Sequence, residues 1–292
     1  MPAISKNRFF AFTLLLLNSA LWGFSVPIIK YSLQFISPPL FLFYRYLLAT
    51  FLFFPIFLIY KARNKHQKIN HQHHITLALL GTPLTLLPLF YGLMASSAIE
   101  SSILESSAPI FVILGGLVYL REKVRPKEWL GVIIALVGTL FLSLYPLLGS
   151  GSFNTLSLKG NLLIILSNLI WAAFLIMSKK DHTNPIYLSF YSFLLSIPFF
   201  LLILLNSPTG FSLNPQALPG IFYMAICGSI IAFWAYIEGQ RRIEASEAAI
   251  FSYLKPAFTI PLAYIWLKEP FTPVAAISTL VILLGVYLSE HR

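Results

Sequence analysis

The chain alternates between long apolar stretches and short polar breaks along its whole length. At a rise of 1.5 Å per residue, a helix of about 20 apolar residues crosses the hydrocarbon core of a bilayer. The pattern therefore predicts an all-α membrane protein with ten transmembrane helices. They are expected at about 9–29, 39–60, 75–95, 98–120, 128–147, 158–178, 184–205, 216–238, 245–267 and 271–289.

Two of these helices need an argument of their own. The first follows Lys6 and Arg8, as the apolar core of a secretory signal would. At about 21 residues it is longer than such a core, so we interpret it as a transmembrane helix. The stretch between His182 and Glu238 holds no charge and is too long for one span. Asn and Pro residues from Asn206 to Pro215 divide it into two.

The lysines and arginines lie mostly in every second break. With the N-terminus in the cytoplasm, fifteen of the twenty lie in inner segments and three in outer segments, and Arg45 and Lys255 lie within helices. An excess of cations on the cytoplasmic side sets the orientation of membrane proteins. We therefore predict an even number of helices, with the N-terminus and C-terminus both cytoplasmic.

Composition supports the membrane assignment and excludes other classes. Of the 292 residues, 58% are hydrophobic and 10% are charged, whereas soluble domains have about 25% charged residues. The net charge of +10 lies in short breaks between apolar stretches, so it predicts no nucleic-acid partner. The single cysteine, Cys227, lies in an apolar run and provides no disulfide or thiolate metal site. We expect no cofactor.

The two halves of the chain repeat each other at a nearly constant spacing. Trp22 matches Trp171 at an offset of 149, and from the third predicted helix on the offset is 147. The pairs at 147 are Gly92 with Gly239, Glu100 with Glu247, Pro109 with Pro256, Gly138 with Gly285, and Leu120-Arg121-Glu122 with Leu267-Lys268-Glu269. A unit of five helices is odd, so the copies enter the membrane from opposite sides, as in many secondary transporters. We predict inverted five-helix repeats over 1–149 and 150–292.

These matched residues also carry a family resemblance. Trp22-Gly23 lies in the first helix, Arg45 lies early in the second, and two similar blocks run from Ala108-Pro109 to Glu122 and from Lys255-Pro256 to Glu269. In this order, and duplicated, they make nearly the whole chain resemble the ten-helix EamA-type exporters of the drug/metabolite transporter superfamily. The resemblance implies a central cavity lined mainly by helices 1, 3, 4, 6, 8 and 9, and export of amino acids or similar metabolites.

Charged residues inside membrane spans are costly and usually mark a substrate or ion site. Arg45 and Glu105 are expected about 10 Å deep in helices 2 and 4, and Lys255 is expected near the middle of helix 9. Glu105 and Lys255 would bind opposite ends of a zwitterion, or all three residues would neutralise one another and fix helix packing. Both interpretations stay open at this point.

Aromatic, polar and proline residues on the same helices complete the candidate site. The aromatic candidates for substrate binding are Trp22, Tyr91, Trp171, Trp234 and Tyr253, and the polar ones are Asn18 and Asn168. The polar side chains could instead hydrogen-bond between helices. Pro109 and Pro256 occupy equivalent repeat positions, where a proline kinks a helix and frees a carbonyl. We interpret them as hinges, with packing curvature as the alternative.

The segment from His66 to His74 carries four histidines, but it lacks acids and cysteines and is expected to be a solvated cytosolic loop rather than a metal site. The small residues Gly115-Gly116, and Gly131 with Ala135, allow close helix contact within the bundle or between protomers. They leave a homodimer open. The lipid bilayer and a small-molecule substrate are the other expected partners.

The predicted function is secondary transport of a small metabolite by alternating access, most simply in a bacterial inner membrane. A channel or a non-transporting scaffold is the alternative, although no repeated polar pore segment is visible. An intramembrane enzyme has less support. The only aspartate is Asp181, and the chain has no His-Glu-x-x-His motif. It also has no glycine loop for phosphate, so an ATP-driven pump is unsupported.

Overall fold

The computed structural model describes residues 6–65, 69–115, 119, 126–148, 155–180, 183–207, 210–243 and 251–290. Within these ranges the chain forms helices joined by turns, with no strand. The first half contains α1 (Lys6–Ser32), α2 (Pro38–Arg63), α3 (His71–Leu79), α4 (Thr85–Ala95), α5 (Ala98–Glu105), α6 (Ala108–Gly115) and α7 (Pro126–Leu148). The second contains α8 (Thr155–Lys180), α9 (Pro185–Leu205), α10 (Leu218–Tyr223), α11 (Ala232–Gln240), α13 (Lys255–Leu262) and α14 (Pro273–Glu290).

Shorter helical segments join some of these helices. A π-helical segment, Leu80–Leu84, connects α3 to α4, and another, Met224–Ile231, connects α10 to α11. A third, Ala263–Leu267, extends α13, and two 3₁₀ turns, Pro215–Ala217 and Phe251–Leu254, precede α10 and α13. The two π segments that interrupt long helices lie 147 residues apart at their C-terminal ends, so they occupy equivalent positions of the repeat.

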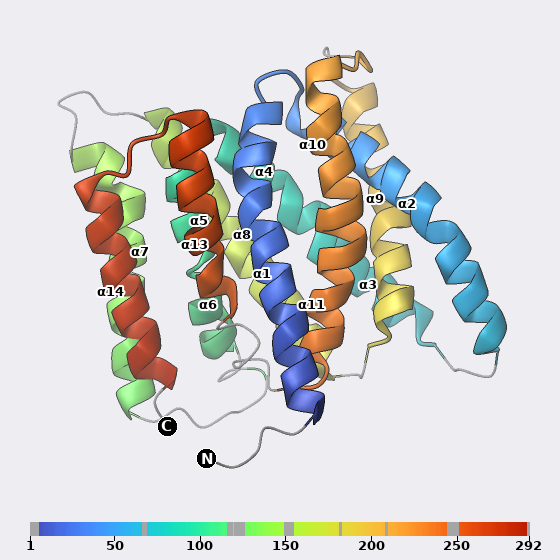
Figure 1. The fold of residues 1–292 in the computed structure, drawn as a ribbon, viewed down its shortest axis with the longest axis horizontal. Coiled ribbons are helices and arrows are strands. Elements are labelled where there is room, and N and C mark those ends of the chain that lie inside the picture. Colours follow the sequence, from blue (N-terminus) through green and yellow to red (C-terminus); the bar gives the residue numbers. More distant parts are fainter. Residues whose placement is uncertain are drawn as a thin grey trace.

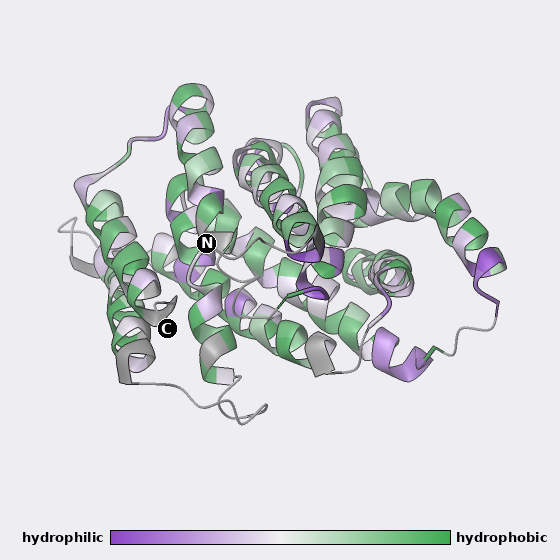
Figure 2. Cartoon of the chain, turned by 60° about the horizontal axis from the view of Figure 1, so that its bottom comes forward, coloured by the Kyte–Doolittle hydropathy of each residue, from purple (hydrophilic) through white to green (hydrophobic). Residues whose placement is uncertain are grey.

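The apolar helices confirm a multi-pass membrane fold in its main features. Among the described residues, six helical stretches are long and apolar enough to cross a bilayer: Asn7–Ser32, Pro38–Arg63, His71–Ala95, Ser157–Ser178, Pro185–Leu205 and Pro215–Gln240. Shorter apolar helices accompany them. Large apolar side chains such as Phe51 and Leu280 are 76% and 68% exposed, and Figure 2 shows hydrophobic residues along the helices with hydrophilic ones near several of their ends. Such a surface requires lipid.

Corresponding helices of the two halves pack against each other. α7 packs on α14, and α2 packs on α9. The contact between α1 and α11 is equivalent by the repeat to the contact between α8 and α4 (Figure 1). On α2 and α9, Tyr46 contacts Phe200, and Phe53 contacts Phe193. As the residue number rises on one helix it falls on the other, so these corresponding helices are antiparallel. An exchange of the halves therefore requires a two-fold axis across the helices.

Individual contacts between the halves also occur in equivalent pairs. A Cβ on Gly92 of α4 would meet Gly160 O and Ile164 of α8, and a Cβ on Gly239 of α11 would meet Ala11 O and Leu15 of α1. Ala11 and Leu15 match Gly160 and Ile164 at the offset of 149. Small residues let the backbones of α4 and α8, and of α1 and α11, approach closely.

Hydrogen bonds between the halves are duplicated as well. Asn18 Nδ2 donates to Ala232 O at 2.9 Å, and its counterpart Ser167 Oγ donates to Thr85 O at 2.9 Å. Both bonds join a buried side chain to a helix of the other half next to a π segment. Asn18, a predicted substrate contact, thus has a hydrogen-bonding role between helices, which is the alternative considered from the sequence.

The predicted cytosolic histidine loop ends earlier than expected. Asn70 Oδ1 accepts a hydrogen bond from His73 N–H at 3.1 Å, so α3 begins at His71, and His74 is buried in its first turn. An asparagine N-cap satisfies one of the free N–H groups at a helix start, which is why the helix extends into the polar segment. The described residues contain no group of three His, Cys, Asp or Glu side chains that could hold a metal ion.

A close approach between the backbones of two helices gives a test of the fold. A Cβ on Gly285 of α14 would lie 2.4 Å from Ala135 N and 2.6 Å from Gly131 O of α7. Since both neighbours are backbone atoms, we expect Gly285→Ala to push the helices apart and to destabilise the protein by about 1–3 kcal/mol. Thermal unfolding of the detergent-purified variant, followed by intrinsic fluorescence, measures the effect.

Gly115→Ala is the matched control, because its new Cβ would meet only the Cδ1 end of Ile176, which can rotate away. A melting temperature lowered equally by the two substitutions would contradict this packing. Gly131 and Ala135 are thus used inside the bundle, as is Gly115, and the homodimer stays a prediction.

Candidate functional site

Two broken helices meet near the centre of the molecule. Residues 98–120 were predicted as one helix, but α5 ends at Glu105 and α6 begins at Ala108, with a turn at Ser106-Ser107. Pro109 explains the break, because it has no N–H to donate to Glu105 O four residues earlier. The corresponding helix, predicted over 245–267, starts α13 only at Lys255, after the 3₁₀ turn Phe251–Leu254.

The predicted hinge prolines thus begin helices rather than kink them. Pro109 and Pro256 each lie in the first turn of their helix, α6 and α13, where the missing N–H costs no helical hydrogen bond. A turn at Ser106-Ser107 precedes α6, and the 3₁₀ turn Phe251–Leu254 precedes α13. Motion about these points remains a prediction.

Each break is fastened by a side chain from the other half of the chain. Asn168 Nδ2 of α8 donates to Leu104 O at 2.8 Å, and Ser19 Oγ of α1 donates to Phe251 O at 2.6 Å. Leu104 matches Phe251 at offset 147, and Ser19 matches Asn168 at offset 149. Each break is therefore tied to a helix of the other half by a side-chain hydrogen bond.

The broken ends carry opposite charges. Glu105 is the last residue of α5 and Lys255 is the first residue of α13, and Lys255 Nζ lies 3.6 Å from Glu105 Oε2. Their side chains are only 13% and 9% exposed. Lys255 Nζ also lies 4.9 Å from the ring centroid of Trp22, in cation–π geometry. The pair therefore joins the two halves of the molecule at the point where both helices break.

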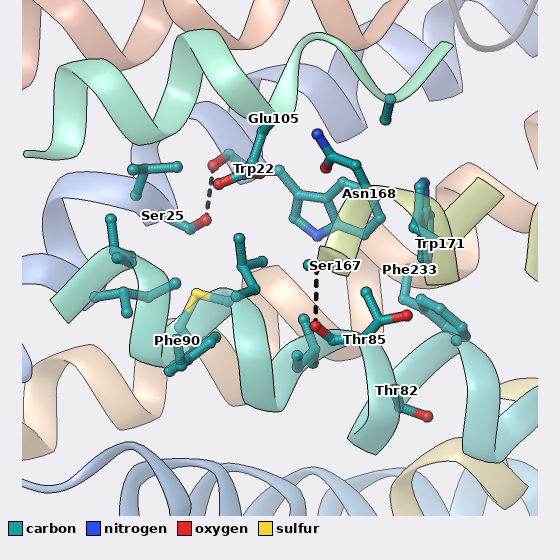
Figure 3. Close-up of a pocket in the computed structure, with 18 of the residues that line it drawn as sticks. Trp22, Ser25, Thr82, Thr85, Phe90, Glu105, Ser167, Asn168, Trp171 and Phe233 are labelled. Atoms are coloured by element: carbon teal, nitrogen blue, oxygen red, sulfur yellow. Dashed lines mark hydrogen bonds between the residues drawn. The ribbon is translucent and has the colours of Figure 1, made fainter. Parts of the chain in front are cut away.

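A cavity of about 90 Å³ lies beside this pair. The residues that line it come from both halves: Trp22, Ser25, Val26, Ile29, Arg45, Tyr46, Gly81, Thr82, Thr85, Leu86, Leu89, Phe90, Leu93, Glu105, Ala108, Ser167, Asn168, Trp171, Met224, Phe233 and Lys255. Figure 3 shows Glu105, Trp22, Asn168 and Trp171 around one side of it and Phe90, Thr85 and Thr82 on the opposite helix. The wall is mostly apolar and aromatic, with a few hydroxyl, amide and charged groups, as is typical of small-molecule sites.

Both interrupting π segments contribute to this region. Gly81 and Thr82 of Leu80–Leu84 and Met224 of Met224–Ile231 line the cavity. In the second segment, Gly228 O accepts a hydrogen bond from Trp22 Nε1 at 3.0 Å. A π segment shifts the helical hydrogen bonds and makes carbonyls accessible to side chains, and it often occurs at functional sites.

An aromatic cluster closes the cavity on the side of the chain termini. The ring centroid of Tyr236 lies 5.5 Å from that of Trp22 and 5.6 Å from that of Trp171, and the two tryptophans lie 5.7 Å apart. In the opposite direction, the lining continues through Ile29 and Leu93, close to the ends of α1 and α4. The cavity is therefore asymmetric along the helices.

The repeat identifies the residue that makes this difference. Tyr236 of α11 corresponds to Leu89 of α4 at the offset of 147. Leu89 lines the cavity, whereas Tyr236 is 1% exposed, stacks on Trp22 and packs at a tilt against Trp171. The two ends of the cavity, related by the two-fold axis, thus differ in whether an aromatic ring fills them.

Arg45 is the third charged residue of the cavity and has different surroundings. It is 4% exposed, its Nε donates to Ser229 Oγ at 2.8 Å, and its guanidinium lies 4.9 Å from the ring centroid of Tyr46. Its Nη1 has no hydrogen-bond partner. Among the described residues no carboxylate lies within ion-pair distance of Arg45. The predicted neutralisation of all three charges is therefore limited to Glu105 and Lys255.

The structure brings six of the predicted binding residues to the cavity wall: Trp22, Arg45, Glu105, Asn168, Trp171 and Lys255. Asn18 is buried in the contact between α1 and α11, and Trp234 is half-buried on α11 outside the lining. Tyr91 is 37% exposed in a separate groove with Phe199 and Asn206. The side chain of Tyr253 lies outside the described residues.

The largest omission from the predicted site is one face of α4 and its π segment. Thr82, Thr85, Leu86, Leu89, Phe90 and Leu93 all line the cavity. They recur at intervals of three and four residues, as one helical face does. Thr82 and Thr85, which are hydroxyl residues in an apolar run, were the available signal. The apolar members could not be told from core or lipid-facing residues by sequence.

This fold and cavity define a polytopic membrane protein with a central site between two inverted halves. The EamA-like transporter family model matches the chain twice, at residues 9–144 and 158–290. The chain belongs to this family and is a multi-pass transmembrane transporter. A solved crystal structure that is 18% identical has a TM-score of 0.68 and covers 98% of this chain and 96% of its own, which supports the fold.

Curated relatives match along nearly the whole chain. An uncharacterized transporter of Archaeoglobus fulgidus is 28% identical over 96% of this chain and 96% of its own. An uncharacterized transporter of Methanothermobacter thermautotrophicus is 26% identical over 97% and 86%, and the uncharacterized transporter YyaM of Bacillus subtilis is 24% identical over 94% and 92%. These names give the class of protein and no substrate.

Proposed function

We propose that the protein exports a small amphipathic metabolite by alternating access of the central cavity to the two sides of the membrane. The observation that carries the proposal is the Glu105–Lys255 pair, which lies between two broken helices of opposite polarity and beside the cavity. Discontinuous helices at the contact between inverted repeats are typical of substrate sites in secondary transporters. The aromatic and apolar wall suits a solute with an apolar body.

The proposal includes the topology predicted from the cation pattern. Ten spans, with both termini in the cytoplasm of a bacterial inner membrane, would put the Trp22–Trp171–Tyr236 cluster on the cytoplasmic side. The cavity would then extend toward the outside in this state. The inward-facing state would exchange the roles of the two ends, which the two-fold relation of the halves makes similar in energy.

Flux into proteoliposomes tests the transport function. Purified protein is reconstituted, and uptake of labelled amino acids and aromatic carboxylates is measured with and without unlabelled solute inside. Saturable uptake that is accelerated by internal solute supports a carrier. Conductance that rises linearly with voltage would indicate a channel instead, and flux equal to that of protein-free liposomes for every solute would contradict the proposal.

A pair of equivalent positions tests the direction in which the cavity faces. In a Cys227→Ser background, Leu89→Cys should react with an impermeant maleimide added outside intact cells, because Leu89 lines the cavity. Tyr236→Cys should react far less, since Tyr236 is 1% exposed within the aromatic cluster. Equal labelling of the two positions would contradict the proposed difference between the two ends of the cavity. Stronger labelling of Tyr236→Cys would reverse the proposed orientation.

A further inference from the structure

The charges of the cavity do not cancel. Glu105 and Lys255 form a pair and contribute no net charge, whereas Arg45 lines the same cavity without a carboxylate partner among the described residues. One positive charge is therefore left over. Burying an unpaired charge is costly unless another group compensates it.

The Arg45 guanidinium has a fixed position, but not all of its hydrogen-bond donors have acceptors. Ser229 Oγ accepts from Nε, and the Tyr46 ring lies beside the cation at 4.9 Å. These contacts fix the direction of the fork while leaving Nη1 without an acceptor. A guanidinium has five N–H donors and binds carboxylates side-on with paired hydrogen bonds. The remaining donor capacity thus matches a compact oxyanion.

Comparison of the two repeats distinguishes residues needed for helix packing from the charged residues of the cavity. Packing positions are duplicated, as in Gly92 with Gly239 and Gly138 with Gly285. Each cavity charge occurs in only one copy, because Glu105 and Lys255 correspond to Ser252 and Ala108. Arg45 corresponds to Ser192 at the offset of 147, which also exchanges the Tyr46–Phe200 contact with the Phe193–Phe53 contact of α9 and α2. At the place of Arg45, α9 keeps its packing against α2 with a serine. The fold therefore does not require an arginine at this position.

We infer that Arg45 binds the anionic group of the transported solute, and that this solute is a monocarboxylate with an apolar or aromatic body. One uncompensated positive charge matches one carboxylate. Phe90, Trp171 and Phe233 line the same cavity and provide apolar surface for the body of the solute (Figure 3). The inference rests on the proposed transport function and adds the substrate class to it.

Binding to the purified full-length protein tests the inference with three probes of similar shape and different charge. They are 3-phenylpropionate, its neutral amide and 2-phenylethylamine, and calorimetry or thermal shift gives their affinities. The wild-type protein should bind the carboxylate about tenfold or more tightly than the amide, because a hydrogen bond to a charged group contributes about 1.5–3 kcal/mol. The amine should bind weakest.

Arg45→Gln should lower the affinity for the carboxylate to that for the amide and leave the amide unchanged. Arg45→Lys, which keeps the charge but loses the fork, should retain part of the preference. Lys159→Gln is the control, since it removes an exposed cation outside the cavity, and it should behave as wild type.

The inference is overturned if the wild-type protein binds the amide as tightly as the carboxylate, or binds none of the probes. It is also overturned if a folded Arg45→Gln protein keeps the preference. The comparison of carboxylate with amide uses the wild-type protein, so it stands even if a variant fails to fold. Saturable flux of a neutral or cationic solute, without a preference for carboxylates, would reject this inference and leave the transport function intact.

Discussion

Glu105→Gln is expected to destabilise the protein and to reduce transport at least about tenfold. Removing one member of a buried ion pair leaves the other charge uncompensated, at a cost of about 3 kcal/mol. Lys255 would keep the ring of Trp22 and an uncharged amide oxygen as partners, and no carboxylate among the described residues. Lys255→Met should lower transport by a similar factor, because it leaves the carboxylate of Glu105 unpaired beside the cavity. Thermal unfolding and counterflow, measured on the same preparations, give the two quantities.

The double variant Glu105→Gln with Lys255→Met separates packing from transport. Replacing both charges of a buried pair is often neutral or stabilising, so the melting temperature should return toward that of the wild-type protein. Transport should stay low, because the charged contact between the two halves at the cavity is still absent. If the double variant recovers stability and transport together, the pair holds the fold and takes no direct part in transport.

The repetition of the sequence predicted more of the fold than the hydrophobic pattern alone. Gly138 and Gly285 match at an offset of 147 in the sequence, and their contacts match as well. A Cβ on Gly138 would lie 3.0 Å from Ile282, and a Cβ on Gly285 would meet Ala135. Ala135 is the residue that corresponds to Ile282 at the offset of 147. Pattern alone could not predict the breaks before Ala108 and Lys255, because proline is common both in kinked membrane helices and in the first turn of a helix.

One contact between the halves could not be predicted from the sequence. The carboxylate of Glu269 accepts hydrogen bonds from the N–H groups of Ala98 and Ile99 at 2.9 and 3.0 Å. It therefore caps the start of α5, about 170 residues earlier in the chain, where an anion is favourable. Lys268 adopts φ 56°, which turns the chain toward that contact.

The charged candidates could be predicted individually but not as a set. Arg45, Glu105 and Lys255 stood out because charges inside apolar helices are rare, and all three line the cavity. Which of them pair depends on the rotation of α2, α5 and α13 about their axes. Hydrophobic periodicity does not fix that rotation when a helix is apolar on every side. The free charge on Arg45 thus became visible only in the structure.

Tyr236→Ala is expected to open the cavity toward the side of the termini. The tyrosine ring stacks on Trp22 and packs on Trp171, and removing a buried aromatic ring from such a cluster costs about 3–5 kcal/mol. Because that cost falls only on the state in which the cluster is closed, the population should shift toward the opposite state. External labelling of Leu89→Cys should fall. Counterflow should become slower, or uptake should no longer depend on internal solute.

Tyr236→Phe is the matched control for this shift. The hydroxyl of Tyr236 is buried without a hydrogen-bond partner, so phenylalanine should keep the ring contacts at no cost in hydrogen bonding. Labelling of Leu89→Cys should therefore stay at its original level in the phenylalanine variant and fall only in the alanine variant. If both substitutions lower the labelling equally, the hydroxyl and not the ring controls this end of the cavity. If neither does, the cluster packs the core without gating it, because closure at this end would then depend on other residues.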